Sequence, residues 1–132
     1  MITISTQHSA ERAAGALSAT LTKLNSGTAG ASVSLYATVR PANGAAAGGA
    51  ALTTLVLPKP AGAIANGILT LGAAPDALIM ETGIAAWARF SVEGVPLFDC
   101  NVSDTSGTAT LRLVTTQLYA GGSVRLASGI LG

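Results

Sequence analysis

The sequence predicts a mainly β protein, a jelly-roll-like antiparallel β-sandwich of about eight strands with one N-terminal α-helix. Three observations support this fold class. From residue 31 onward, short segments alternate apolar and polar side chains, turn residues separate them at roughly regular spacing, and helical periodicity is confined to one segment near the start. We expect all 132 residues to form one domain, with residues 1–30 supplying a strand and the helix.

The first thirty residues contain both of these elements. Isoleucines alternate with polar residues over 2–5, which predicts a short strand. Thr6 or Ser9 can cap the helix that follows, and Asn25 and Gly27 can end it. Its predicted apolar stripe has spacings of three and four residues and consists of Ala10, Ala13, Ala14, Leu17, Leu21 and Leu24.

Four short strands are expected between residues 31 and 80. Val33 and Leu35 alternate with polar neighbours, and Arg40 and Pro41 stop that strand. A loop rich in glycine and alanine follows at 43–49. The other three strands are predicted at 52–57, 68–71 and 78–80.

The most regular predicted strand covers residues 84–92. Its alternation places Ile84, Ala86, Ala88, Phe90 and Val92 on one face, and Ala85, Trp87, Arg89 and Ser91 on the other. Residues 93–96 form a hairpin turn in which Gly94 can take a positive φ. The returning strand at 97–102 has Phe98, Cys100 and Val102 on one face and Asp99 and Asn101 on the other.

The last part of the chain continues this β pattern. Residues 103–107 read as a second turn, and Ala109, Leu111 and Leu113 alternate with polar residues in the strand after it. Gly121 and Gly122 precede a final strand at 124–130.

Charged residues are scarce. Seven Lys or Arg and six Asp or Glu make up 10% of the chain, against about 25% in ordinary soluble domains. One interpretation is a surface of Ser, Thr, Asn and Gly; the other is a subunit largely covered by neighbours, because interface cores are depleted in charge. We favour the second.

Charge and targeting signals narrow the class of partner. The net charge of +1 provides neither a basic field for nucleic acid nor a polybasic segment for a membrane. Residues 1–12 lack the features of a signal peptide, and the single cysteine cannot form an internal disulfide. We therefore expect neither a nucleic-acid nor a membrane partner, and a protein assembled in a reducing cytoplasm.

Catalytic and metal-binding patterns are weak. His8 has no second histidine or nearby cysteine with which to hold a metal ion. Cys100 lies on an apolar strand face, and the carboxylates of Glu93 and Asp99 flank one hairpin without a recognisable catalytic arrangement. We expect no enzymatic activity, no cofactor and no metal.

Two groups of residues are candidates for protein contacts. Arg40, together with Arg89, Arg112 and Arg125 on the polar faces of late strands, could meet acidic groups of a partner, or could pair with Asp99, Glu93 and solvent. Ile2, Thr3 and Ile4 could add as a strand to the edge of another sheet. Trp87, if exposed, could instead form a sugar-binding platform.

Several segments carry a resemblance to known proteins: Leu35-Tyr36, Arg40-Pro41, 52–55, 83–89, 111–114, 120–122 and Val124. They resemble a group of small phage virion proteins, most of all the jelly-roll cement, or decoration, proteins of short-tailed phage heads. The resemblance covers most of the chain, although its motifs are packing and turn residues, and Glu93-Gly94 replaces the usual Asp-Gly turn.

This resemblance implies a structural role in a virion. A cement protein binds the outer surface of the phage head after assembly in the bacterial cytoplasm, and bridges neighbouring shell subunits against the pressure of the packaged DNA. The implied partners are the major capsid protein and copies of the chain itself. Alternatives are a tail or baseplate accessory protein and a carbohydrate-binding adhesion module.

Overall fold

The computed structural model describes residues 2–42 and 44–131 and contains one helix and twelve strands in these ranges. The helix α1 spans Thr6–Leu24. The strands are β1 Ser32–Tyr36, β2 Thr53–Val56, β3 Gly62–Ala65, β4 Ile68–Leu71, β5 Ala77–Leu78, β6 Gly83–Ile84, β7 Trp87–Val92, β8 Val95–Asp104, β9 Leu111–Leu113, β10 Gln117–Leu118, β11 Ser123–Val124 and β12 Leu126–Leu131.

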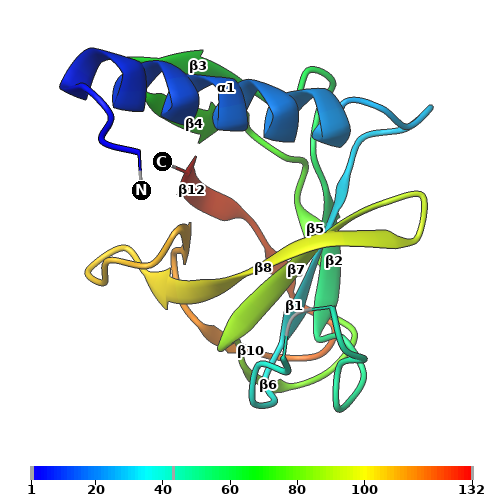
Figure 1. Cartoon of the computed structure of the whole chain (residues 1–132). Coiled ribbons are helices and arrows are strands. Elements are labelled where there is room, and N and C mark those ends of the chain that lie inside the picture. Colours follow the sequence, from blue (N-terminus) through cyan, green and yellow to red (C-terminus); the bar gives the residue numbers. More distant parts are fainter. Residues whose placement is uncertain (1, 43, 132) are drawn as a thin grey trace.

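Eight of the strands form one curled sheet, in the order β2-β1-β7-β8-β9-β12-β4-β3. The short strands form two ribbons, β10–β6 and β11–β5, and α1 lies across β3 and β4 (Figure 1). The predicted mainly β fold with one helix is confirmed, and the curled sheet is consistent with a β-sandwich. The sheet is mixed rather than wholly antiparallel, because β8 and β9 pair in parallel.

Several predicted boundaries differ from the structure. Residues 2–5 form no strand, because no strand of the described chain pairs with them; of these residues, Ser5 has extended backbone angles. The predicted strand at 84–92 is broken at Ala85 and Ala86, where the chain passes from the β6–β10 ribbon to the large sheet. The predicted apolar face therefore does not continue through the break, because the side chains of Ile84 and Ala86 are exposed. Strands β3 and β10 were not predicted.

Helix α1 is anchored mainly through its C-terminal half. Ser5, one residue before the predicted caps, is the N-cap, and its Oγ accepts a hydrogen bond from the backbone N–H of His8 at 3.1 Å. Leu17 and Leu24 are buried, whereas residues 6–13 are all exposed. The helix ends at Asn25 as predicted, and the Asn25 side chain accepts a hydrogen bond from the N–H of Ala61 at 2.8 Å.

The β7–β8 hairpin lies at the centre of the large sheet. Its turn has positive φ at both Glu93 (50°) and Gly94 (82°), which is the two-residue geometry that matches the twist of hairpin strands. Phe90 is buried and stacks on Phe98 of the adjacent strand, with ring centroids 4.4 Å apart. This face of the hairpin packs into the apolar core, as the alternation predicts.

The opposite face of β7 is also buried, in contrast to the prediction. Trp87 is 1% exposed; it stacks on Tyr36 at 4.5 Å and its Nε1–H donates to the Thr38 hydroxyl at 3.3 Å. Arg89 donates to the backbone carbonyl of Ala45 at 2.7 Å. The chain between β1 and β2 therefore folds over this face, which sequence alternation alone predicted to be open.

Candidate protein-interaction surfaces

The predicted stripe of arginines does not form a continuous surface. Arg89 donates from Nε and Nη2 to the two carboxylate oxygens of Asp99, at 2.8 and 3.0 Å, and both side chains are largely buried. The bonds to Asp99 raise the pKa of the Arg89 guanidinium. Arg89 is thus paired with Asp99, which is the alternative interpretation of this residue, and its burial leaves little of it for a partner to contact.

The other three arginines lie in separate surroundings. Arg40 is exposed and donates to the Asn101 side chain at 3.0 Å. Arg112 is half-buried, and its Nε lies 3.4 Å from the carbonyl of Ala109. Arg125 forms an exposed ion pair with Asp76 at 2.9 Å. Arg40 and Arg125 remain accessible to a partner.

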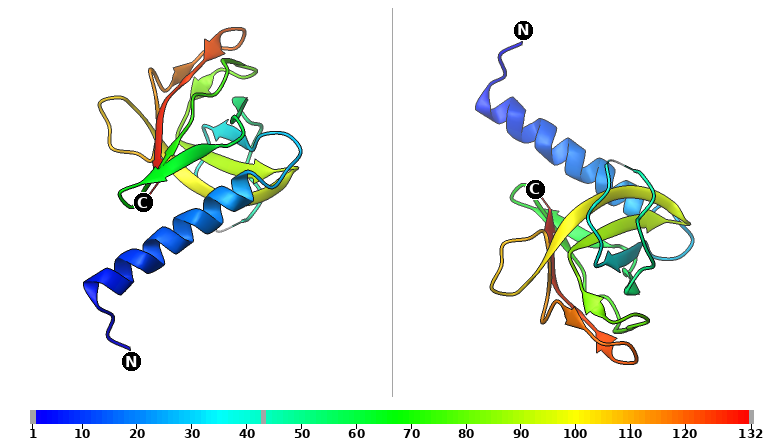
Figure 2. Two further views of the ribbon diagram at one scale, coloured as in Figure 1. Left: turned by 90° about the horizontal axis from the view of Figure 1, so that it is seen from above. Right: turned by 90° about the horizontal axis from the view of Figure 1, so that it is seen from below.

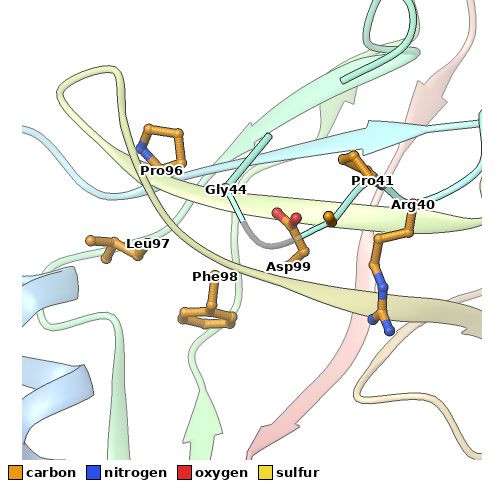
Figure 3. A pocket seen from close by; sticks show the side chains of 8 residues that line it. Arg40, Pro41, Gly44, Pro96, Leu97, Phe98 and Asp99 are labelled. Atoms are coloured by element: carbon orange, nitrogen blue, oxygen red, sulfur yellow. The ribbon is translucent and has the colours of Figure 1, made fainter. Parts of the chain in front are cut away.

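Arg40 and Asp99 also line a hollow of about 540 Å³ between residues 40–42 and 44 on one side and strand β8 on the other. Figure 3 shows that Arg40 and Pro41 lie on one side of this hollow and Pro96, Leu97 and Phe98 follow β8 along the other. The Asp99 carboxylate at this hollow is already paired with Arg89.

Residues 2–13 form an arm that extends from the body of the protein. Both views in Figure 2 show the first part of α1 projecting beyond the sheets. Ile2 is 85% exposed, Thr3 is exposed and Ile4 is half-buried. The structure thus places the predicted contact residues Ile2, Thr3 and Ile4 on a projecting segment, where another protein can reach them.

A groove of about 530 Å³ lies between β2 and β5. Leu78 and Met80 on its wall are 59% and 65% exposed, and Val56 on the opposite wall is half exposed. Two bonds join its two walls, from the Thr53 hydroxyl to the carbonyl of Leu78 and from the N–H of Met80 to the carbonyl of Leu52, both at 2.7 Å. We refer to this feature as the β2–β5 groove.

A second apolar hollow, of about 590 Å³, lies on the other side of Asp76. Buried Leu118 and Val124 contribute to its lining, and exposed Val114 and Tyr119 stand beside them. Since Asp76 lines both hollows, the β5–β11 ribbon separates two neighbouring apolar surfaces. Exposed apolar surface of this kind is typical of protein contacts.

The side chains considered as candidates for catalysis or metal binding have other contacts or are buried. The Nδ1 of His8 lies 3.3 Å from Glu11 Oε2 on the exposed helix, and Glu93 accepts hydrogen bonds from the N–H and hydroxyl of Thr28. Burial raises the pKa of the Cys100 thiol to about 12. Within residues 2–42 and 44–131, no group of three or more His, Cys, Asp or Glu side chains is placed to hold a metal ion.

The turn at residues 103–107 is stabilised by the Asp104 side chain. The Asp104 carboxylate accepts hydrogen bonds from the N–H and hydroxyl of Ser106 and from the N–H of Gly107. The Ser106 bonds hold the pKa of Asp104 below its ordinary value.

The helix of the described chain is not long and apolar enough to cross a membrane.

Sequence reasoning missed the β2–β5 groove. The run Leu78-Ile79-Met80 was predicted as a strand, but a continuous apolar run has no alternation from which to tell its exposed side chains from buried ones. In the structure Ile79 is buried while its two neighbours are exposed. The uninterrupted apolar run was the available signal.

We compared the chain with protein families, with curated proteins and with solved structures, and no match was found in any of the three comparisons.

Proposed function

We propose that this chain is a structural subunit of a larger protein assembly, and specifically a cement protein on the outside of a phage head. The observation that carries the proposal is the number of large apolar side chains that are exposed in a chain with few charges. Among the described residues, eleven large apolar side chains are exposed, in a chain with only thirteen charged residues. Such a surface is unfavourable in water and is stabilised when partner subunits cover it.

The fold supports a mechanical role. An eight-stranded sheet with a central hairpin provides a rigid body, and the arm at residues 2–13 extends from it (Figure 2). A rigid body with a projecting arm can contact two neighbouring subunits at once, which is what bridging a shell requires. The choice of a phage head as the shell rests on the sequence resemblance.

The proposal is tested by adding the purified protein to heads of the virus that encodes it, prepared without it. We expect saturable binding in hundreds of copies per head and a higher temperature of DNA release. Failure to bind, or binding without a rise in that temperature, would contradict the cement role.

A tail or baseplate accessory protein is the alternative of the same class, and copy number separates the two. Quantitative gel analysis of intact particles should give hundreds of copies for a cement protein and at most a few dozen for a tail component. Trp87 is not available as a sugar-binding platform, because it is buried beneath the chain between β1 and β2.

A further inference from the structure

The two ends of the eight-stranded sheet differ in how far their outer edges are covered. Strand β2 ends the sheet on one side, and residues 78–81 lie along it, since the N–H groups of Met80 and Glu81 both donate to the carbonyl of Leu52. Strand β3 ends the sheet on the other side, and β4 is its only partner among the described strands. The open edge of the sheet is therefore that of β3.

Hydrogen bonding within the β3–β4 hairpin determines which backbone groups face outward. The N–H of Gly72 donates to the carbonyl of Ala61 at 2.8 Å, which marks these two residues as a hydrogen-bonded pair. Bonded and non-bonded pairs alternate along an antiparallel ladder. The two-residue turn Asn66-Gly67, with both φ angles positive, closes the hairpin in the same phase. The N–H and C=O groups of Gly62 and Ile64 therefore point away from β4.

The two faces of the β3–β4 hairpin have opposite surroundings. Helix α1 packs against both strands (Figure 1), and Ile64 and Leu69 belong to the apolar core that also includes Leu17 and Leu24 of the helix. The opposite face is exposed and uncharged, and its residues on β3, β4 and the adjoining β12 are Ala63, Ala65, Ile68, Thr70 and Ile130. An apolar exposed face thus adjoins the open edge.

The β3 edge lacks the features that usually keep a sheet edge unpaired. Natural proteins protect such edges with charged side chains, proline or a bulge. The β3 sequence Gly-Ala-Ile-Ala has no charge and no proline, and it pairs with β4 residue for residue without a shift. Lys59 lies before the strand, where its ammonium group donates to the carbonyl of Gly27. The edge is therefore available to a further strand.

This edge is complementary to itself, which favours a second copy of the chain as its partner. When two β3 strands lie antiparallel about a two-fold axis at Ala63, Gly62 of each copy faces Ile64 of the other. The outward N–H groups of both copies then all meet outward C=O groups. The two Ala63 residues face each other as a non-bonded pair, whose close spacing suits a methyl side chain.

We propose that two copies of this chain join edge to edge through β3, antiparallel about a two-fold axis at Ala63, so that their sheets become one continuous sheet. The exposed faces beside the two edges then form one apolar surface across the axis. Because each copy uses the same residues, the contact closes as a dimer. The inference rests on the proposed role as an assembly subunit and names the contact through which copies join.

Crosslinking of the full-length protein tests both the contact and its register. In the proposed dimer the two Cα atoms of Ala63 lie about 4.5 Å apart, within reach of a disulfide. The two Cα atoms of Ala65 lie about 14 Å apart along the strands. Under mild oxidation, Ala63→Cys should give a covalent dimer on a non-reducing gel, and the equally exposed Ala65→Cys should not. The buried Cys100 should stay unreactive in both.

Charges placed at the axis test the energetics of the same contact. In sedimentation the unmodified chain should form dimers, and Ala63→Lys should weaken association about tenfold, because two like charges then face each other. The control Ala127→Lys changes an exposed residue of β12, which β4 separates from β3, and should leave association unchanged. A mixture of Ala63→Lys with Ala63→Glu should associate again. Because a folding defect would not be rescued by mixing, this recovery reports on the contact itself.

A chain that is monomeric at all concentrations would overturn this inference, as would equal crosslinking at positions 63 and 65 or no recovery in the mixture. These measurements use purified protein without any shell, so their failure is separate from failure of the cement role. A chain that dimerises through β3 but does not bind heads would retain the contact and lose the cement assignment. A monomeric chain whose binding to heads is lost in Ala63→Lys would assign the edge to a shell subunit and overturn the pairing of copies.

Discussion

Two arginine–aspartate pairs of nearly equal length lie in opposite surroundings. Arg89 and Asp99 are 2.8 Å apart with side chains 9% and 12% exposed, whereas Arg125 and Asp76 are 2.9 Å apart and 70% and 48% exposed. The first pair joins the central strands β7 and β8, and the second joins the region of the β5–β11 ribbon. Bond length alone therefore does not tell which pair matters for folding; burial does.

The contrast extends to the apolar residues around each pair. Near Arg89, aromatic side chains are buried on both faces of β7, and the Arg89 guanidinium lies 5.3 Å from the ring of Trp87. Near Asp76, Leu78 and Met80 are exposed at the β2–β5 groove. The centre of the sheet is thus a scaffold, whereas the ribbon end offers surface to a partner.

Replacing Trp87 should have the largest effect. Trp87→Ala removes a buried ring that stacks on Tyr36 and should lower the free energy of unfolding by about 4 kcal/mol. The matched control is Tyr119→Ala, which removes an exposed aromatic ring at the ribbon end and should cost less than about 0.5 kcal/mol. Urea unfolding followed by circular dichroism measures both, since Trp87 is the only tryptophan of the chain. Similar losses in the two variants would contradict the division into scaffold and contact surface.

Breaking the buried ion pair should have the next largest effect. Arg89→Ala leaves the Asp99 carboxylate without its two donors and the Ala45 carbonyl without its partner, and should cost about 3 kcal/mol. Arg89→Lys keeps the charge but cannot donate in the two-pronged geometry, so it should fall between Arg89→Ala and the unmodified protein. If the lysine variant is as unstable as the alanine variant, the planar donor geometry rather than the charge is what stabilises this site.

The fold could be predicted where the local sequence determines it, and not where long-range contacts do. The β7–β8 hairpin could be predicted because strict alternation and Glu93-Gly94 fix its strands and turn locally. The burial of Trp87 and Arg89 could not, because it depends on contacts with Thr38 and Ala45, which are long-range and have no periodic signal. Residues 2–5 have the pattern of a strand but lack a neighbouring strand to pair with, and pattern alone cannot supply one.

The candidate surface was predictable in part. Ile2, Thr3 and Ile4 were identified because their alternation is that of a strand that could add to the edge of another sheet, and they do lie on the arm. The arginines were grouped because each alternates with apolar residues, yet strand order puts Arg89, Arg112 and Arg125 on different parts of the molecule. Charged residues in a sequence are candidates for partner contacts, but only the fold shows which of them are already paired within the chain.

Cys100 should give a smaller effect that appears only at high pH. Its thiol pKa is raised by burial from the ordinary 9.0 to about 12, so the folded protein keeps this proton while the unfolded chain loses it. Stability from this group is fully present below pH 9 and falls by about 1.4 kcal/mol per pH unit above it. Unfolding free energies measured from pH 8 to 10.5 should therefore decline more steeply for the unmodified protein than for Cys100→Ala. Parallel curves would show that the thiol is not shielded from water.

Breaking the exposed pair should have the smallest effect. Arg125, by hydrogen bonding and by its charge, holds the pKa of Asp76 below its ordinary value, so the pair favours the folded state above that value and loses this effect as the pH falls. Because both side chains face water, the attraction is screened by salt, and Arg125→Ala should not change the melting temperature measurably at physiological ionic strength. Melting curves in low and high salt check this, with Asp76→Asn as the reciprocal variant. A loss comparable to that of Arg89→Ala would mean that Asp76 organises the ribbon itself, and the two pairs would then differ in exposure but not in role.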